Sequence, residues 1–281
     1  MKSWEEQIAL FPGSDLVREK VGPAAEHVTD QVAPRFVDLD YKDALAADNY
    51  PLPATAAREG YYGDKHFDYW LSGLKDSSDA LDLIGKLMPE RPQSYLDFGG
   101  ASGRVARHMA LAHKIPKVWI ADINREHVNF IADVFPGVIT AFQSTSLPHL
   151  PIEDNSFDLV TAYSVFSHIE TFDDTWLLEL RRILRPGGVL LITANVDRFQ
   201  EITPAWPVYK ALANYPGMDH AEFGHPLKEE RRVFRWKADA SYSSNVFMRE
   251  AYVARRWGPL FASWEVIRHY APFQAGVVFQ K

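Results

Sequence analysis

A glycine-rich turn is the first place in the chain where residue types and spacing suggest chemistry. Asp97 is followed at alternate positions by Gly99, Ala101 and Gly103, with Gly100 inside the turn. Glycine lets a ligand approach the backbone without a Cβ in the way, and a helix that begins there offers unpaired N–H groups. The pattern predicts a site for a polar ligand. A purely structural turn is the alternative, because one glycine-rich turn is weak evidence.

A carboxylate at the end of the next predicted strand supports the ligand interpretation. Asp122 lies 23 residues after Gly99 and directly follows the apolar residues 117–121. A carboxylate in that place can accept hydrogen bonds from both hydroxyl groups of a ribose. The alternative is that Asp122 caps the following helix, but Asn124 is placed for that role. The turn and the acid together predict a nucleoside site.

The glycine spacing distinguishes between two kinds of nucleoside. The dinucleotide fingerprint G-x-G-x-x-G would need glycines at 99, 101 and 104, where the chain has Gly99, Ala101 and Arg104. An acidic residue followed by glycines or small residues at alternate positions instead resembles the first motif of the class I S-adenosylmethionine-dependent methyltransferases. An NAD-dependent enzyme is therefore the least favoured alternative.

The resemblance to this family continues in family order over about 105 residues. Residues 150–160, LPIEDNSFDLV, resemble the stretch that leads into the family's fourth strand. Residues 164–169, SVFSHI, resemble the segment after that strand, and residues 176–193 resemble the helix, turn and fifth strand. Each motif alone is weak or moderate evidence, but their combination is specific.

The resemblance implies a cofactor role for each matching position. Asp97 and the turn would hold the methionine end of S-adenosylmethionine, Asp122 its ribose, and Ile123 would contact adenine. Ser144 stands at the adenine edge, where many relatives have an aspartate, and Tyr163 would line the methionine arm. Simple core packing is the alternative for Ile123 and Tyr163. The full set is Asp97, Gly99, Gly100, Ala101, Gly103, Asp122, Ile123, Ser144 and Tyr163.

Three further residues are candidates for the acceptor side. His168 follows the fourth strand, near where the family places the transferable methyl group, and a neutral imidazole can take a proton near physiological pH. The alternative is a histidine that only hydrogen-bonds backbone near the helix predicted at 173–184. Tyr61 and Tyr62 would help to close the cofactor pocket, as amino-terminal tyrosines do in similar enzymes. An aromatic cluster that packs the cap onto the sheet is the alternative for both tyrosines.

Short apolar runs that alternate with helical stretches must position these residues. This alternation predicts βαβ units, and with the resemblance it implies a Rossmann-like α/β methyltransferase fold. The expected sheet is mostly parallel and seven-stranded, with helices on both faces. A further helix is predicted to open at Ser77. The other predicted helices are 103–113, 124–134 and 173–184, and the strands are 94–98, 117–121, 138–142, 157–163, 189–194, 264–270 and 276–280.

Changes in the residue pattern along the chain predict how it is divided into regions. Residues 1–90 are predicted to form an amino-terminal helical cap or lid, and residues 91–281 the cofactor-binding core. Residues 198–258 lose the strand–helix rhythm and form the predicted substrate-side insertion. A basic cluster within it also contains Glu229 and Glu230, so a solvated strand or helix face is favoured over an anion site. Its basic residues are Lys228, Arg231, Arg232, Arg235 and Lys237.

Composition excludes several classes of protein. Thirty Lys and Arg against 37 Asp and Glu give a net charge of −7, which argues against nucleic acid or anionic membranes as partners. Zero cysteines exclude disulfides and thiolate nucleophiles. The acidic amino terminus and the lack of a long apolar run favour a cytoplasmic location. No metal is expected, because the fourth strand ends without a carboxylate cluster.

The function that follows from these features is methyl transfer from S-adenosylmethionine to the oxygen, nitrogen or carbon of a small-molecule acceptor. The fourth strand ends in residues 162–165, AYSV. It therefore lacks the Asn/Asp-Pro-Pro-aromatic pattern that is typical of methyltransferases acting on nucleobase amino groups. The alternative is a non-catalytic S-adenosylmethionine-binding or regulatory module. The sequence makes no prediction about the acceptor's identity or the oligomeric state.

Overall fold

The computed structural model describes residues 36, 39–58, 61–236 and 244–281, in two compact units that divide between Ser146 and Leu147. Residues 1–35, a large part of the predicted cap, lie outside the described residues. The first unit contains α2 (Lys42–Ala47), η4 (Ala56–Arg58), α3 (His66–Ile84), β1 (Ser94–Phe98), α4 (Ala106–Leu111), β2 (Lys117–Asp122), α5 (Arg125–Val134) and β3 (Thr140–Gln143).

The second unit carries the remaining strands. They are joined by short helices and turns, and the insertion supplies two of them. Its elements are β4 (Phe157–Ala162), α6 (Asp173–Ile183), β5 (Leu184–Val196), η5 (Phe199–Glu201), α7 (Tyr209–Ala213), η6 (His220–Glu222), β6 (Arg231–Arg235), β7 (Ser244–Met248), α8 (Glu250–Tyr252), η7 (Val253–Trp257), η8 (Gly258–Leu260), β8 (Ser263–Ile267) and β9 (Ala275–Gln280).

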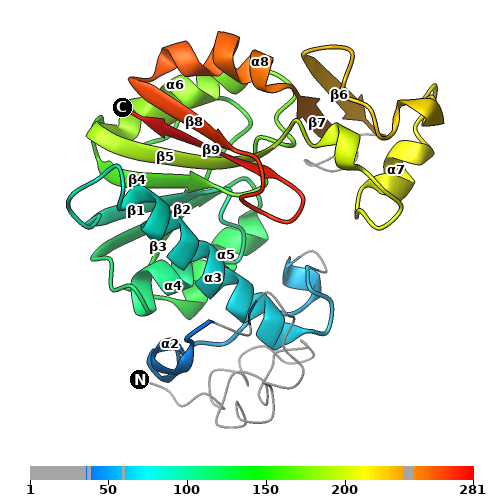
Figure 1. The fold of residues 1–281 in the computed structure, drawn as a ribbon. Helices are drawn as coiled ribbons and strands as arrows, with labels where there is room; N and C mark the ends of the chain where they lie inside the picture. Colours follow the sequence, from blue (N-terminus) through cyan, green and yellow to red (C-terminus); the bar gives the residue numbers. More distant parts are fainter. Residues whose placement is uncertain (1–35, 37–38, 59–60, 237–243) are drawn as a thin grey trace. The chain divides into compact units, whose positions relative to one another are not determined.

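Three parallel strands form the sheet of the first unit, in the order β3-β2-β1 (Figure 1). Strand β1 is buried at every position, as expected for a parallel strand covered on both faces. Helix α4 packs on β1 and β2, and α5 packs on β2 and β3. The strands predicted at 94–98 and 117–121 are confirmed. The third begins at Thr140 rather than 138, because the N–H groups of Val138 and Ile139 bond back to the Phe135 carbonyl.

Helix α3 differs from its prediction. It begins at His66 and continues through Ser77, where the sequence predicts a helix start. The hydroxyl of Ser77 donates to the carbonyl of Leu74 at 2.8 Å, and that of Ser72 donates to Tyr69 at 2.6 Å. Both serines therefore bond to the preceding turn of the helix instead of capping a new one.

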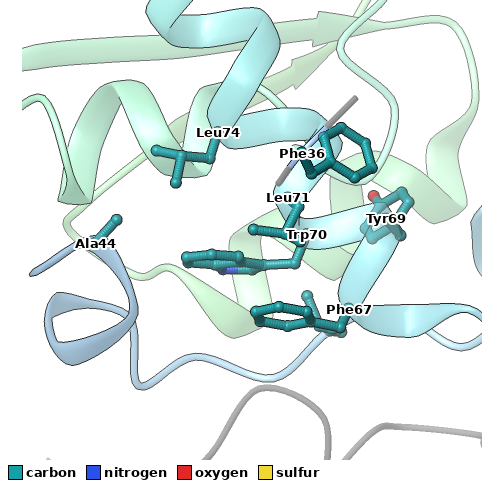
Figure 2. Close-up of a cluster of buried hydrophobic side chains, with 8 residues drawn as sticks. Phe36, Ala44, Phe67, Tyr69, Trp70, Leu71 and Leu74 are labelled. Carbon is teal, nitrogen blue, oxygen red and sulfur yellow. The ribbon is translucent and has the colours of Figure 1, made fainter. Parts of the chain in front are cut away.

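An aromatic cluster fills the space between α3 and the segment before it (Figure 2). Phe67 stacks on Trp70 with ring centroids 5.7 Å apart and planes 10° apart. Phe67, Tyr69 and Trp70 are each at most 2% exposed, whereas Tyr61 is 54% exposed. The aromatic residues between Tyr61 and Trp70 therefore differ in their role: Phe67, Tyr69 and Trp70 pack in the core, and Tyr61 does not.

A buried ion pair fixes the segment before α3 onto α4. Arg107 donates to both carboxylate oxygens of Asp48, at 2.7 and 2.8 Å, and Trp70 Nε1 donates to the same carboxylate at 2.7 Å. Burial acts to raise the pKa of Asp48, but the charge and hydrogen bond of Arg107 outweigh it and hold the pKa below its usual value. Next to this pair, burial lowers the pKa of His108 to about 3.

The sheet of the second unit is mixed. Strand β4 pairs with β5 in parallel, while β9 runs antiparallel to β5 and to β8. Helix α6 ends at Ile183, one residue before the predicted end, and β5 begins at Leu184, five residues before the strand predicted at 189–194. The strand predicted at 264–270 ends earlier, at Ile267, and leaves Tyr270 in a loop.

The insertion builds a small hydrophobic core of its own, to one side of β8 and β9 (Figure 1). Strands β6 and β7 form an antiparallel hairpin, and β7 extends the sheet by a short parallel pairing with the end of β5. Phe234 from β6 and Phe247 from β7 pack with Phe199. The described residues therefore contain the seven expected strands and two more from the insertion, and the fold class is confirmed.

Among the helices that the structure describes, none is long and apolar enough to cross a membrane.

Candidate active site

The carboxyl ends of three strands come together in the first unit. The strand register places Phe98 beside Ala121 and Asp122 beside Gln143. Beyond the strands, the N–H of Gly99 donates to the carbonyl of Ala121 at 2.7 Å, and the N–H of Ser144 donates to that of Asp122 at 2.8 Å. The sequence-predicted residues of this unit therefore share one edge of the parallel sheet, which is where open α/β sheets bind ligands.

The turn after β1 needs glycine for two different reasons. Gly99 and Gly103 have φ of 72° and 81°, in the left-handed region that favours glycine. At Gly100 the reason is space, because a Cβ there would lie 2.9 Å from the Cβ and Cγ of Asp97. Asp97 is only 2% exposed, so the turn is folded tightly over this carboxylate.

Asp122 fastens the turn to β2. One carboxylate oxygen accepts the backbone N–H of Ala101 at 2.8 Å, and the other accepts that of Asn124, also at 2.8 Å. The cap of α5 is Asn124, whose side chain accepts from Glu126 at 2.9 Å, so the capping alternative for Asp122 is not what the structure shows. Nδ1 of the buried His127 lies 3.4 Å from the oxygen that accepts from Asn124, and the other oxygen has a second lone pair that can accept from a ribose hydroxyl.

Ile123 and Ser144 lie next to each other at the ends of β2 and β3. Ile123 is partly exposed rather than a core residue, and its carbonyl accepts from the side chain of Gln143 at 3.1 Å. Ser144 is 7% exposed. An apolar side chain beside a buried hydroxyl provides both a face and an edge for a planar heterocycle.

Contacts between α3 and the glycine turn were not predicted from the sequence. The hydroxyl of Tyr69 lies 3.2 Å from that of Ser102, inside the turn. A Cβ on Gly73 would lie 1.9 Å from the carbonyl oxygen of Arg104, so α3 crosses the turn at its smallest residue. A glycine in the interior of a helix is the available signal for such a close approach.

The two candidate lid tyrosines approach the same turn. The ring of Tyr62 lies edge-on to Tyr69, with centroids 6.4 Å apart. The guanidinium of Arg104 lies 5.6 Å from the ring centroid of Tyr61. Burial raises the pKa of Tyr69, so its phenol stays protonated under the turn. Tyr61, which is exposed, and Tyr62, which is partly exposed, therefore lie near the turn, and Tyr62 contacts the buried Tyr69, whose hydroxyl reaches the turn.

His168 lies in the second unit, in the segment after β4. Its Nδ1 lies 2.7 Å from the carbonyl oxygen of Ser244, the first residue of β7. The hydroxyl of Ser244 donates to the His168 carbonyl at 3.1 Å, and the N–H of Val246 donates to that of Ser167 at 2.8 Å. A carbonyl only accepts, so Nδ1 carries the proton and Nε2 is the basic nitrogen of the neutral ring. The partner is the insertion, not the helix entrance considered in the sequence analysis.

Tyr163, also in the second unit, ends up beside an unpredicted partner. Its hydroxyl lies 3.0 Å from that of Tyr270, in the loop between β8 and β9. Both rings are partly exposed.

The three arginines of the basic cluster lie on β6, and each of them contacts a neighbouring part of the chain. Arg231 donates to the carbonyls of Ile169 and Glu170, and Arg232 pairs with Glu222 at 2.5 Å. Arg235 pairs with the Glu170 side chain. These contacts favour the solvated strand face over an anion site. Lys237 of this cluster lies outside the described residues.

Comparisons with known proteins agree with this arrangement. Residues 96–192 match the family described as "Methyltransferase domain". The ubiquinone/menaquinone biosynthesis C-methyltransferase UbiE of Cupriavidus pinatubonensis is 32% identical over 117 residues, which are 41% of this chain and 48% of that protein. The corresponding protein of Chromobacterium violaceum is 27% identical over 152 residues, 53% of this chain and 56% of that one. The chain thus spans about half the length of the curated relatives it matches.

Solved structures show the same fold. CalS10, an amino pentose methyltransferase from Micromonospora echinaspora, superposes with a TM-score of 0.52 at 18% identity, covering 82% of this chain and 98% of that one. Streptomyces venezuelae DesVI gives a TM-score of 0.52 at 15% identity, with 80% and 97% covered.

Fold and sequence comparisons agree on the type of fold. The chain has the Rossmann-like fold of the class I S-adenosylmethionine-dependent methyltransferases. The part of the chain that matches the family described as "Methyltransferase domain", residues 96–192, runs from within β1 to within β5 of this fold.

Proposed function

We propose that the protein is an S-adenosylmethionine-dependent methyltransferase that acts on a small molecule. One observation carries this proposal: Gly99, Asp122 and Ser144 meet at the ends of three parallel strands, with the Asp122 carboxylate bonded to the glycine turn. The turn offers backbone N–H groups to a carboxylate, and Asp122 offers lone pairs to ribose hydroxyls. Ile123 and Ser144 supply the adenine contacts in this proposal.

The chemistry demands little from the side chains. When bound, S-adenosylmethionine supplies a methyl group that is already activated by its sulfonium. The chain's task is then to bind, to align the acceptor and to exclude water, which are effects of proximity and orientation. This agrees with a site made largely of backbone and of a few fixed polar groups.

His168 is the proposed general base of the reaction. Its Nδ1–H is held by the Ser244 carbonyl, so the lone pair lies on Nε2, the nitrogen that would take a proton from an acceptor hydroxyl or ammonium. The same hydrogen bond makes the insertion responsible for the tautomer. An acceptor that must lose a proton is therefore favoured.

Tyr61 and Tyr62 are the proposed closing residues of the cofactor site. Their contacts with Arg104 and Tyr69 connect them to the turn, while the exposure of Tyr61 leaves it room to move. Limited proteolysis of residues 50–75 tests this role. Slower cleavage with S-adenosylhomocysteine supports a lid, and equal rates with and without it contradict one.

Two measurements test the function. Isothermal titration should show binding of S-adenosylhomocysteine and much weaker binding of NAD, and the reverse order would overturn the proposal. Incubation of a metabolite library with methyl-labelled S-adenosylmethionine, followed by mass spectrometry, should reveal a product that has gained one labelled methyl group. Cofactor binding without any such product would instead favour the non-catalytic module.

A further inference from the structure

A buried histidine occupies an otherwise apolar face of helix α5. The buried residues of this helix are spaced by three and four positions, as expected for the face that packs on the sheet: His127, Phe130, Ile131 and Val134. His127 is 3% exposed, so its imidazole is almost completely removed from water. A polar ring in such a position costs free energy unless polar groups of the protein contact it. The imidazole is therefore expected to have a polar partner on the sheet side of α5.

That partner is the carboxylate of Asp122, at the end of β2. Nδ1 of His127 lies 3.4 Å from Oδ1 of Asp122, and the two side chains are 4% and 5% exposed. The separation is longer than a normal hydrogen bond, but water screens an electrostatic contact between two buried groups only weakly. A carboxylate oxygen only accepts, so the contact is favourable when Nδ1 carries a proton.

The two oxygens of the Asp122 carboxylate have different surroundings. Oδ1 accepts the backbone N–H of Asn124 and faces His127, so both contacts come from the start of α5. Oδ2 accepts the backbone N–H of Ala101, in the glycine turn. The carboxylate is thus held by α5 through one oxygen and by the turn through the other. His127 adds its contact at Oδ1, which leaves the second lone pair of Oδ2 for a ribose hydroxyl.

The same face of α5 also lies close to the glycine turn. Ile131 follows His127 by four positions, and a Cβ on Gly103 would be 2.6 Å from Cδ1 of Ile131. Residues four apart on a helix are neighbours on one face. One face of α5 therefore approaches both the turn and the carboxylate that bonds to it, and it places His127 in a fixed position at the proposed cofactor site.

We propose that His127 is a positioning residue for ribose recognition: its Nδ1–H holds the charged Asp122 carboxylate in the orientation that binds the ribose of the cofactor. This inference rests on the proposed methyltransferase function and deepens it by adding a residue that acts through Asp122. The sequence pattern of glycines and acid does not identify this histidine, because its position on α5 is that of a packing residue.

The test uses the full-length protein and two ligands, S-adenosylhomocysteine and its 2′,3′-dideoxy analogue. Isothermal titration compares the wild type with His127→Leu, which keeps a side chain on the buried face of α5 and removes the donor. His127→Asn restores a donor, because an asparagine amide nitrogen can lie nearly where Nδ1 lies. Val134→Ala is the control for weakened packing, since Val134 ends the same buried face. Thermal melting checks that each variant is folded.

A second comparison repeats His127→Leu in the Asp122→Asn background. A residue that acts through Asp122 has an effect that depends on the carboxylate, whereas a residue that only packs the helix has the same effect in both backgrounds. His127→Met is a further apolar variant for the same comparison. Its unbranched side chain adapts more easily to the space if His127→Leu does not fold.

The expected pattern separates positioning from packing. His127→Leu should bind S-adenosylhomocysteine about three- to ten-fold more weakly than the wild type, because a contact with a charged group is lost. Its affinity for the dideoxy analogue should change little, and His127→Asn should recover most of the preference for ribose. Val134→Ala should lose stability and keep both affinities. In the Asp122→Asn background, His127→Leu should have little further effect.

Four results would overturn the inference: an unchanged ribose preference in His127→Leu, equal weakening of both ligands, no recovery in His127→Asn, or the same effect of His127→Leu in both backgrounds. A wild type that binds the two ligands equally would also overturn it. Failure of the wild type to bind S-adenosylhomocysteine is a different outcome, which contradicts the proposed function itself.

Discussion

The carboxylate of Asp122 accepts the backbone N–H of Ala101 across 2.8 Å, and Ala101 holds a left-handed φ of 46°. The residue proposed to bind ribose thus also stabilises the turn proposed to bind the methionine end. These two roles of Asp122 predict different effects of substitution, so they can be separated by experiment.

Asp122→Asn tests the ribose role. The wild type should bind S-adenosylhomocysteine about ten-fold or more tighter than its 2′,3′-dideoxy analogue, because charge-assisted hydrogen bonds to the hydroxyls are lost in the analogue. In Asp122→Asn this preference should largely disappear. Isothermal titration of both ligands against both proteins gives the answer, and a wild type without the preference would leave Asp122 as a turn residue only.

Gly100→Ala tests the contact between the turn and Asp97. The new Cβ would lie 2.9 Å from the Asp97 side chain, so the turn must shift and S-adenosylhomocysteine binding should weaken at least about ten-fold. Gly137→Ala is the control, since Gly137 has φ of 75° with open space around it. The control should lose a little stability and no affinity. Equal affinity in both variants would contradict a tight turn.

Asp48→Asn tests the buried ion pair that holds the segment before α3. Asp48 and Arg107 are each 1% exposed at the side chain, so loss of one charge leaves the other buried without its partner. Urea unfolding should show a loss of about 3–5 kcal/mol. Asp79→Asn, which breaks the exposed pair with Lys75, should cost less than about 1 kcal/mol. Similar losses would mean that burial does not distinguish the pairs.

Local patterns in the sequence were enough to predict several elements. The bounds of β1 were predicted as observed, and Asn124 was identified as the cap of α5, because an apolar run and a capping side chain act on their own neighbours. Ser77 misled for the same reason: its type favours a cap, but its hydroxyl bonds back within α3. Sequence type does not decide between those two local hydrogen bonds.

Contacts between distant segments could not be predicted in this way. The Tyr69–Ser102 contact spans 33 residues and the Tyr163–Tyr270 contact spans 107, and neither leaves a periodic pattern. The residues of the parallel strand ends were predictable because the fold itself brings such ends together. The partners supplied by loops and by the insertion depend on side-chain packing that only the structure shows.

His108 predicts how stability depends on pH. Burial lowers its pKa to about 3, so the folded protein keeps it neutral while the unfolded chain binds a proton below about pH 6.5. Above that pH, His108 should not change the free energy of unfolding. Below it, the free energy of unfolding should fall as the pH drops toward 3, by about 1.4 kcal/mol per pH unit for this proton. Urea unfolding between pH 7.5 and 5 measures the slope.

His108→Gln removes the titrating group, and an amide can keep a donor near the Trp70 carbonyl, which lies 2.9 Å from Nε2. Below pH 6.5, the slope of the unfolding free energy against pH should become shallower by the contribution of one proton. His113, whose pKa burial lowers to about 4, should preserve part of it. A wild-type slope in His108→Gln would contradict this account.

His168→Asn separates the proposed base from a structural histidine. The asparagine amide can donate to the Ser244 carbonyl from nearly the position of Nδ1, so the contact with β7 is retained while the basic Nε2 is removed. Turnover of the acceptor found by the library screen should fall about 10²–10⁴-fold, with S-adenosylhomocysteine affinity and melting temperature close to wild type. Full turnover in this variant would reduce catalysis to proximity and alignment. His168→Ala, which also loses the β7 contact, should be less stable than His168→Asn, and equal stability would mean that the bond to Ser244 does not hold the insertion in place.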